Sequence, residues 1–264
     1  MKIALTIAGS DSGGGAGIQA DLKTFHQFGC FGTSAIVALT AQNTRGVRGV
    51  HEVPTDFIAL QLQALADDLP PAALKTGMLA SAAIVETVTD AIQRHDWGPL
   101  VADPVMISSS GDRLLRADAE REIRTRLLPL AALVTPNLDE AALLTRREVR
   151  SVAQMEDAGR ALLQLGAEAA LVKGGHGTED DVTDVLVTNE GIVRYRHPRL
   201  RTRSTHGTGC TVSAAVTAGF AQGQLLAQAV RDALEFTTRA IEHAPGLGGG
   251  HGPLDHTVAV HVGA

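Results

Sequence analysis

Short apolar runs alternate with amphipathic stretches along most of the 264-residue chain. The apolar runs have strand length, and the stretches between them have the three-to-four-residue spacing of helices. This pattern predicts strands at residues 3–8, 33–40, 73–76, 100–102, 131–135 and 169–173. It predicts helices from about Ala16, from Pro54 to about Ala66, and at about 81–95, 116–127, 137–145 and 151–165. Continuous apolar runs indicate strands buried on both faces, so we expect an α/β fold with a mainly parallel sheet between helices.

The rhythm changes after residue 173. Two further strands, at 182–188 and 192–197, flank the turn sequence Asn-Glu-Gly at 189–191, which indicates a hairpin. Helices at about 208–221 and 224–243 follow, and no linker or shift in composition divides the chain, so we expect a single domain over 1–264. The glycine-rich segment 246–252 is either a strap over a site or a frayed end, and its position near the terminus favours fraying.

The composition, with 44% hydrophobic and 20% charged residues and a mean hydropathy of +0.08, is that of a soluble globular protein. No apolar run reaches the roughly 18 residues that a membrane-spanning helix needs. The apolar start of the chain resembles a signal peptide, but a glycine-rich loop follows at once and no cleavage site is visible, so we interpret it as a strand.

The net charge and the cysteine content limit the classes of binding partner and the redox compartment that fit this chain. A formal net charge of −6 and 3% aromatic residues argue against binding to nucleic acid, so we expect a small-molecule partner. The two cysteines, Cys30 and Cys210, are far apart and outside any CxxC pattern, which suggests neither a zinc site nor a disulfide framework. A reducing cytoplasm fits best.

The first predicted strand runs into a glycine-rich loop at residues 9–17, Gly-Ser-Asp-Ser-Gly-Gly-Gly-Ala-Gly. In open α/β sheets, ligands bind at the carboxyl ends of strands, where such a loop offers backbone N–H groups. The loop is not a Walker A motif, because Gly-Lys-Ser/Thr occurs nowhere in the chain, and its partial GxGxxG match is a weak signal. A tight turn that needs glycine for positive φ is the alternative.

A second glycine-containing segment, Thr-His-Gly-Thr-Gly-Cys-Thr at 205–211, precedes a helix rich in small residues. The first N–H groups and the dipole of that helix favour an anion, such as a phosphoryl group in transfer. The same position is expected to lower the pKa of the Cys210 thiol and make it a candidate base or covalent centre. The alternative is a capped helix start with a buried cysteine.

Lys173 ends a predicted strand and is followed by glycines, in a chain that has only four lysines among 23 basic residues. Such a lysine can reach phosphate oxygens, although a surface lysine is the alternative. Asp103 follows another strand, and Asn137 and Glu140 lie one helical turn apart after a third. Oxygen ligands of this kind suit Mg²⁺ held through water, whereas a helix N-cap with an acidic first turn explains Asn137 and Glu140 equally well.

These features share one location, since all of them fall at the carboxyl ends of predicted strands. Chance spacing does not readily arrange such agreement. Together they indicate phosphoryl transfer and leave the acceptor open.

With these motifs in view, nearly the whole chain resembles the ribokinase-like superfamily, and within it the bacterial hydroxymethylpyrimidine and phosphomethylpyrimidine kinases of thiamine biosynthesis. The resemblance is carried by residues 8–23, 39–44, 75–79, 102–106, 110–112, 135–141, 173–176, 206–211 and 250–253. It implies a three-layer α/β/α sandwich, dependence on ATP and Mg²⁺, and a homodimer. It also implies phosphorylation of 4-amino-5-hydroxymethyl-2-methylpyrimidine and then of its monophosphate.

The resemblance also implies roles for individual residues. Gln42 would hydrogen-bond the amino group and a ring nitrogen of the pyrimidine. Around the substrate it places Ala16, Met78 and Val105 in the pocket wall, with Gly9 and Asp21 close by. Around the nucleotide it places Lys173, Asn137 and Thr208, with Asp103, Asn137 and Glu140 organising Mg²⁺ and its waters. Gly207, Gly209 and Cys210 would form the anion hole.

One position departs from the wider superfamily, in which most sugar and nucleoside kinases carry an aspartate base where this chain has Cys210. Cysteine is usual in the pyrimidine kinase branch, so the resemblance does not settle which group is the base. Some relatives with this cysteine accept pyridoxal, and pyridoxal or pyridoxine kinase activity is therefore the nearest alternative. A non-catalytic nucleotide or vitamin sensor is a third hypothesis, and the intact set of Lys173, Asn137 and Glu140 argues against it.

Overall fold

A computed structural model describes residues 1–106, 116–175 and 181–260. The predicted motif at 110–112 and His176 lie outside the described residues. Among the helices that are described, none is long and apolar enough to cross a membrane.

The described strands form one sheet of nine, in the order β3-β2-β1-β4-β5-β6-β7-β8-β9. They are β1 (Ile3–Asp11), β2 (Phe31–Asn43), β3 (Gly46–Glu52), β4 (Ala73–Thr76), β5 (Leu100–Ala102), β6 (Ala131–Val134), β7 (Ala169–Val172), β8 (Asp181–Thr188) and β9 (Ile192–Pro198). The run from β2 through β1, β4, β5 and β6 to β7 is parallel, whereas β3, β8 and β9 pair antiparallel. The predicted mainly parallel sheet is confirmed.

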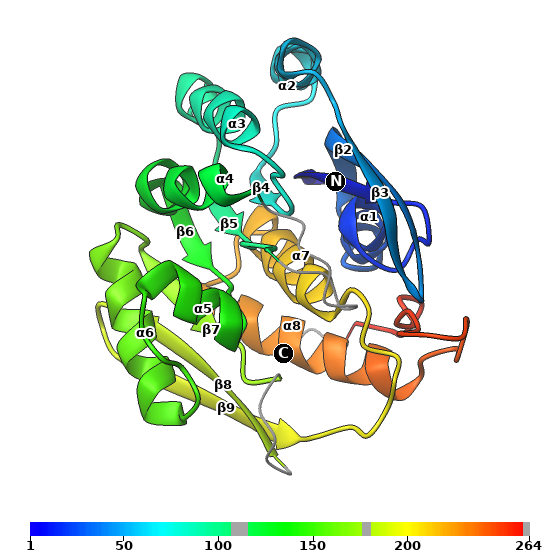
Figure 1. Cartoon of the computed structure of the whole chain (residues 1–264), viewed down its shortest axis with the longest axis vertical. Coiled ribbons are helices and arrows are strands. Elements are labelled where there is room, and N and C mark those ends of the chain that lie inside the picture. Colours follow the sequence, from blue (N-terminus) through cyan, green and yellow to red (C-terminus); the bar gives the residue numbers. More distant parts are fainter. Residues whose placement is uncertain (107–115, 176–180, 261–264) are drawn as a thin grey trace.

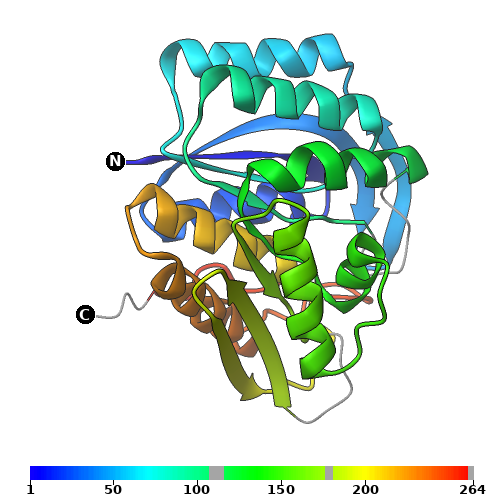
Figure 2. The same ribbon diagram turned by 90° about the vertical axis from the view of Figure 1, so that its left-hand side faces the viewer.

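Helices cover both faces of this sheet and make a three-layer α/β/α sandwich (Figures 1 and 2). One face carries α2 (Thr55–Asp68), α3 (Ala82–His95), α4 (Ala117–Glu122), α5 (Leu138–Thr145) and α6 (Val152–Gln164). The other carries α1 (Gly17–Gln27), α7 (Thr208–Ala221) and α8 (Leu226–Glu242). The small residues of α7 are buried nearly all round, which lets this helix pack between the sheet and α8.

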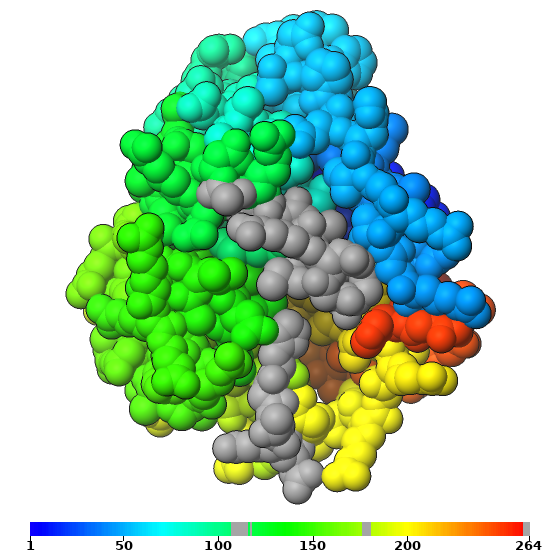
Figure 3. Space-filling model, in the orientation of Figure 1, coloured from blue at the N-terminus to red at the C-terminus, as the bar shows by residue number. Residues whose placement is uncertain are grey.

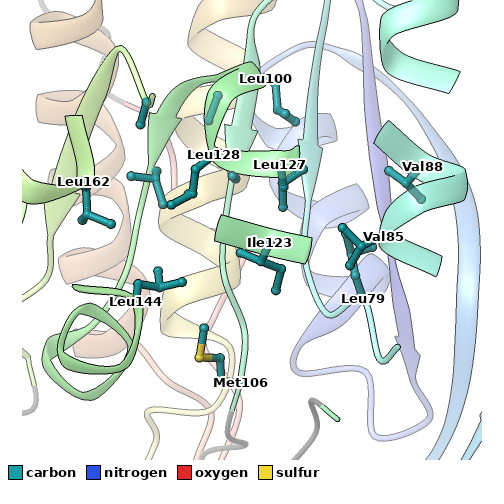
Figure 4. Packing of buried hydrophobic residues seen from close by; sticks show 14 of the residues in the cluster. Leu79, Val85, Val88, Leu100, Met106, Ile123, Leu127, Leu128, Leu144 and Leu162 are labelled. Carbon is teal, nitrogen blue, oxygen red and sulfur yellow. The ribbon is translucent and has the colours of Figure 1, made fainter. Parts of the chain in front are cut away.

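Every residue of β4, β5 and β7 is buried, and apart from Lys75 and Thr76 of β4 these strands are apolar. On the face covered by α2 to α6, Leu100 of β5 belongs to a core cluster with Val85 of α3 and Leu162 of α6. Figure 4 shows these side chains together with Leu127, which follows α4. A core on each face fixes the helices and the loops between them.

The structure differs from the sequence prediction in two elements. Strand β3 was not predicted, because it lies at the sheet edge beside β2, where four of its seven residues are exposed and no continuous apolar run is needed. The helix predicted at 116–127 is α4 followed by a π-helical turn, Ile123–Leu127, and a 3₁₀ turn, Leu128–Leu130. Pro129 lies in that last turn and has no N–H with which to continue an α-helix.

The glycine-rich segment 246–252 is a strap, so the favoured expectation of a frayed end was wrong. The His251 N–H donates to Thr44 O at 2.7 Å, and the His206 N–H donates to Gly252 O at 3.1 Å. These bonds tie the segment to the β2–β3 hairpin on one side and to the loop before α7 on the other. Figure 3 shows the red C-terminal chain against the blue hairpin.

Candidate active site

A cavity of about 530 Å³ opens at the carboxyl ends of the parallel strands. It is lined by all of the predicted site residues: Gly9, Ala16, Asp21, Gln42, Met78, Asp103, Val105, Asn137, Glu140, Lys173, Gly207, Thr208, Gly209 and Cys210. The fold therefore brings together residues from seven separate loops and strand ends, because parallel strands present their carboxyl ends on one edge.

Lys173 and Asp103 form an ion pair at 3.2 Å inside this cavity. Asp103 is 2% exposed and also accepts hydrogen bonds from Thr135 and Ser213, each at 3.1 Å. Burial alone would raise the pKa of this carboxyl, but the ammonium groups of Lys173 and Lys75 hold it below its usual value. Lys173 is thus held in place as a cation rather than extended into solvent, contrary to the surface-lysine alternative.

The first turn of α7 meets Lys173. A Cβ atom added to Gly209 would lie 3.0 Å from Lys173 Nζ, so the glycine allows the ammonium to approach the helix start. Gly207, the N-cap, has φ +84° and packs against the backbone oxygen of Gly15. Backbone N–H groups at a helix start have no helical acceptors, so this turn and Lys173 offer the donors and the positive charge that an anion needs.

Cys210 does not have the lowered pKa expected of a cysteine at a helix start. Its thiol lies in a half-buried position at the cavity wall, and burial raises its pKa to about 12 despite the nearby Lys75 ammonium. Asp21 and Asp103 add to this rise, because their negative charges oppose a thiolate. Loss of hydration and two carboxylates outweigh the helix dipole, so the thiol is neutral at pH 7.

Asn137 and Glu140 form a capping box at the start of α5. The Glu140 N–H donates to Asn137 Oδ1, and the Asn137 N–H donates to Glu140 Oε2, both at 2.9 Å. Burial raises the pKa of Glu140 to about 7, with Lys173 opposing the rise. The N-cap interpretation is therefore correct for both residues, and their cavity-facing position leaves a second role open.

The floor of the cavity contains an ion pair that the sequence did not single out. Lys75 Nζ lies 2.8 Å from Asp21 Oδ1, both side chains are 0% exposed, and the Thr6 hydroxyl donates to Asp21 Oδ2 at 2.6 Å. Burial alone would lower the pKa of Lys75, but the Asp21 carboxylate raises it. Asp21 is thus bonded to both Lys75 and Thr6 at the floor of the cavity.

The opposite wall of the cavity combines apolar groups with one side-chain amide. A Cβ atom on Gly9 would lie 2.6 Å from Met78 Cε, so the glycine leaves room for the methionine. Gln42 reaches this wall from the end of β2, where its backbone N–H donates to Ser12 Oγ at 2.9 Å. Apolar wall residues beside one amide are suited to a small polar ring.

Comparison with known proteins places this site in a family. Residues 11–255 match the family described as phosphomethylpyrimidine kinase. The hydroxymethylpyrimidine/phosphomethylpyrimidine kinase of Streptomyces coelicolor is 49% identical, with 96% of this chain and 94% of that protein covered. The chain belongs to the phosphomethylpyrimidine kinase family. The resemblance inferred from the motifs is confirmed.

Solved structures agree with this membership. The phosphomethylpyrimidine kinase of Clostridium difficile is 40% identical with a TM-score of 0.82, covering 91% of this chain and 100% of that one. The pyridoxal kinase of Bacillus subtilis in complex with ADP is 37% identical with a TM-score of 0.91, covering 97% of this chain and 98% of that one. The fold is thus shared by kinases named for a pyrimidine and for pyridoxal.

In this member of the phosphomethylpyrimidine kinase family, the cavity continues past Lys173 to β8, β9 and α8. There the Gly174 N–H donates to Asp184 Oδ1 at 2.8 Å, and His197 Nε2 lies 3.1 Å from Asp184 Oδ2. The hydrogen bond with Asp184 raises the pKa of His197. The sequence did not indicate Asp184 or His197 as site residues, because a polar position on a hairpin strand carries no local sign of a site.

Proposed function

We propose that the chain transfers the γ-phosphoryl group of ATP to the hydroxymethyl oxygen of 4-amino-5-hydroxymethyl-2-methylpyrimidine, and then phosphorylates the monophosphate. Membership in the phosphomethylpyrimidine kinase family supports this function. The observation that carries it is the single cavity in which Gln42 and Met78 line one wall while Lys173 and Gly209 line another. A ring and a triphosphate can therefore meet within one cavity.

ATP is the proposed phosphoryl donor, and the ADP complex of the Bacillus subtilis relative supports an adenine nucleotide. Its phosphates would contact Lys173, Thr208 and the first turn of α7, while the base would lie toward β8, β9 and α8. Lys173 would neutralise phosphate charge and the N–H groups of Gly209 and Cys210 would hold the transferred group in line with the attacking oxygen.

Mg²⁺ fits the cavity only through water. Asp103 and Glu140 already accept hydrogen bonds from protein donors, and within the described part of the chain no group of three or more His, Cys, Asp or Glu side chains is arranged to hold a metal. Asp103, Asn137 and Glu140 would hold the waters of a magnesium ion, which keeps several of them in proteins. Such an ion would neutralise charge on the phosphates.

Cys210 would position the transferred group rather than remove a proton. A thiol whose burial raises its pKa to about 12 is protonated at neutral pH. Phosphoryl transfer through a loose transition state depends mainly on alignment and charge neutralisation, so the substrate hydroxyl needs little help from a base. The homodimer implied by the resemblance stays a prediction, as does the single domain over 1–264 expected from the absence of a linker.

The test compares kcat/KM for the pyrimidine and for pyridoxal at one ATP concentration. We expect kcat/KM for the pyrimidine to exceed that for pyridoxal by about tenfold or more. A ring without the amino group would leave the Gln42 side-chain amide without a hydrogen-bond partner. Formation of the diphosphate, followed by phosphorus NMR, tests the second transfer. A preference for pyridoxal would establish the alternative function, and no turnover of either ring with ATP and Mg²⁺ would favour a sensor.

A further inference from the structure

The glycine-rich loop after β1 already holds an anion, the carboxylate of Asp11. This side chain is 2% exposed and accepts hydrogen bonds from the N–H groups of Gly13 at 2.8 Å, Gly15 at 3.0 Å and Ala16 at 2.8 Å. Backbone N–H groups that converge in this way would otherwise suit a phosphate. These three donors are taken, so they do not compete with the first turn of α7 for a phosphoryl group.

The same carboxylate ties the loop to the residue that precedes this turn. His206 Nε2 lies 2.8 Å from Asp11 Oδ2. Burial by itself would raise the pKa of Asp11, but the hydrogen bond with His206 and the one from the Gly13 N–H lower it to about 2. An ionised carboxylate only accepts, so the ring nitrogen carries a hydrogen and donates it. The bond is therefore charge-assisted, which makes it stronger than a hydrogen bond between neutral groups.

The His206 ring is also packed against the loop. A Cβ atom on Gly15 would lie 2.6 Å from His206 Cδ2, so the absence of a side chain lets the imidazole lie against the glycine backbone. The His206 N–H donates to Gly252 O of the strap at 3.1 Å. His206 is thus held by a carboxylate, by the loop backbone and by the strap.

The first turn of α7 spans the distance from this fixed residue to Lys173. Gly207 follows His206 directly and abuts the Gly15 oxygen. Two residues further, Gly209 faces the Lys173 ammonium. A shift of His206 would therefore move the N–H groups of this turn relative to that ammonium. A displacement of about 1 Å in a reacting group can cost about 100-fold in rate.

We propose that the Asp11–His206 pair positions the first turn of α7 for phosphoryl transfer, with Asp11 as the anchor and His206 as the residue that carries the turn. This inference rests on the proposed function, in which that turn holds the transferred group. Both side chains act through the backbone that follows His206 rather than on the phosphates. They are positioning residues.

The first test compares His206→Gln with His206→Met. The two side chains have similar length, but only glutamine carries an N–H group that can reach Asp11 in place of imidazole Nε2. We expect His206→Met to lower kcat by about 30-fold and His206→Gln to recover about tenfold of that loss. KM for the ring should change by less than about threefold in both variants, because the turn holds the phosphoryl group. Equal kcat values for the two variants would overturn the proposal.

The second test uses Asp11→Asn to identify the anchor. Its side-chain oxygen can still accept, but the acceptor is neutral, and a charge-assisted hydrogen bond is about twice as strong as a neutral one. In this background the kcat gap between His206→Gln and His206→Met should shrink by about threefold or more. An unchanged gap would show that His206 acts through another group, such as the Gln42 amide, whose nitrogen lies 3.3 Å from Nε2, and would refute the role of Asp11.

Thermal unfolding checks that each variant folds. If His206→Met does not fold, His206→Asn replaces it, because asparagine keeps the amide but is one methylene shorter than glutamine. Its kcat should then lie about tenfold below that of His206→Gln, and equal values would again contradict the proposal. If Asp11→Asn does not fold, the comparison at position 206 decides.

The assays use whichever ring, the pyrimidine or pyridoxal, the wild-type protein phosphorylates faster. A preference for pyridoxal would overturn the acceptor given in the proposed function and leave the positioning of the turn testable with pyridoxal. Absence of turnover with both rings would overturn the proposed function and this inference together. Turnover with equal kcat in the two His206 variants would overturn the inference alone.

Discussion

The protonation state of Cys210 follows from the groups packed around it. The thiol lies near the Asp21–Lys75 pair and Asp103, and its raised pKa reflects burial first and the carboxylates second. Lys173, in contrast, remains charged beside Asp103. A neutral thiol and a fixed cation predict unequal effects when each side chain is removed.

We expect Cys210→Ala to keep measurable turnover, within about tenfold of wild type, because alignment does not need a thiolate. Lys173→Ala should lose about 100-fold or more in kcat, the effect of deleting one group that stabilises developing charge. Steady-state rates at saturating ATP and pyrimidine measure both. Cys30→Ala, which removes the other, buried thiol, is the control, and a dead Cys210→Ala beside an active Lys173→Ala would contradict the prediction.

The raised pKa of Glu140 predicts that this residue lowers folding stability at alkaline pH while it serves activity. Its pKa rises from 4.5 to about 7 on folding, so the folded state keeps a proton that the unfolded chain releases between these values. The contribution of Glu140 to the free energy of unfolding therefore falls as pH rises through this window and stays low above it. At pH 8 the buried Glu140 carboxylate is charged and lowers the free energy of unfolding.

Glu140→Gln should raise the free energy of unfolding at pH 8 by about 1–3 kcal/mol and change it little at pH 4.5. Glutamine can still accept from the Asn137 N–H, so the cap is kept. Activity should fall, because the carboxylate proposed to hold the waters of Mg²⁺ is lost. Urea unfolding at both pH values measures the effect, with the exposed Asp139→Asn as control; equal stability at pH 8 would contradict it.

The start of α7 is the element that we propose holds the transferred phosphoryl group. Glycine is needed at its two glycine positions for different reasons. Gly207 has a positive φ and abuts the Gly15 oxygen, whereas Gly209 faces the end of the Lys173 side chain. A methyl group at the first position meets backbone, which cannot give way. At the second it meets a flexible ammonium group, which can.

Gly209→Ala should therefore displace Lys173 Nζ from Asp103 and lower kcat/KM for ATP by about tenfold, the effect of weakening one charged contact. Stability should stay within about 0.5 kcal/mol of wild type, since alanine favours a helix. Gly207→Ala is the contrasting variant and should lose folding stability instead. Thermal unfolding and initial rates separate the two, and unchanged ATP kinetics in Gly209→Ala would refute the prediction.

Across the whole molecule, the parallel order of β1, β4, β5, β6 and β7 is what assembles the site. Each of these strands ends at the same edge, so their following loops converge although they are far apart in sequence. The strap at 246–252 then joins the β2–β3 hairpin to the segment before α7. The C-terminal segment is thereby hydrogen-bonded to the N-terminal β2–β3 hairpin.

The sequence by itself determined the sheet interior, and its motifs pointed to residues that all line one cavity. Continuous apolar runs predicted β5 and β7, because strands buried on both faces have apolar side chains on both. Glycines, Lys173 and the acidic strand ends predicted a phosphate site, since these residue types follow from its chemistry. The resemblance of the motifs then identified the family.

Only the tertiary structure decided properties that arise between distant segments. The raised pKa of Cys210 comes from burial first and from the Asp21 and Asp103 carboxylates second, which helix position alone does not reveal. The link from Asp11 to His206 joins residues 195 positions apart, and Asp184 enters the cavity from a hairpin without a motif. Burial and the charges around a group are set by its neighbours in space, so local patterns could not predict them.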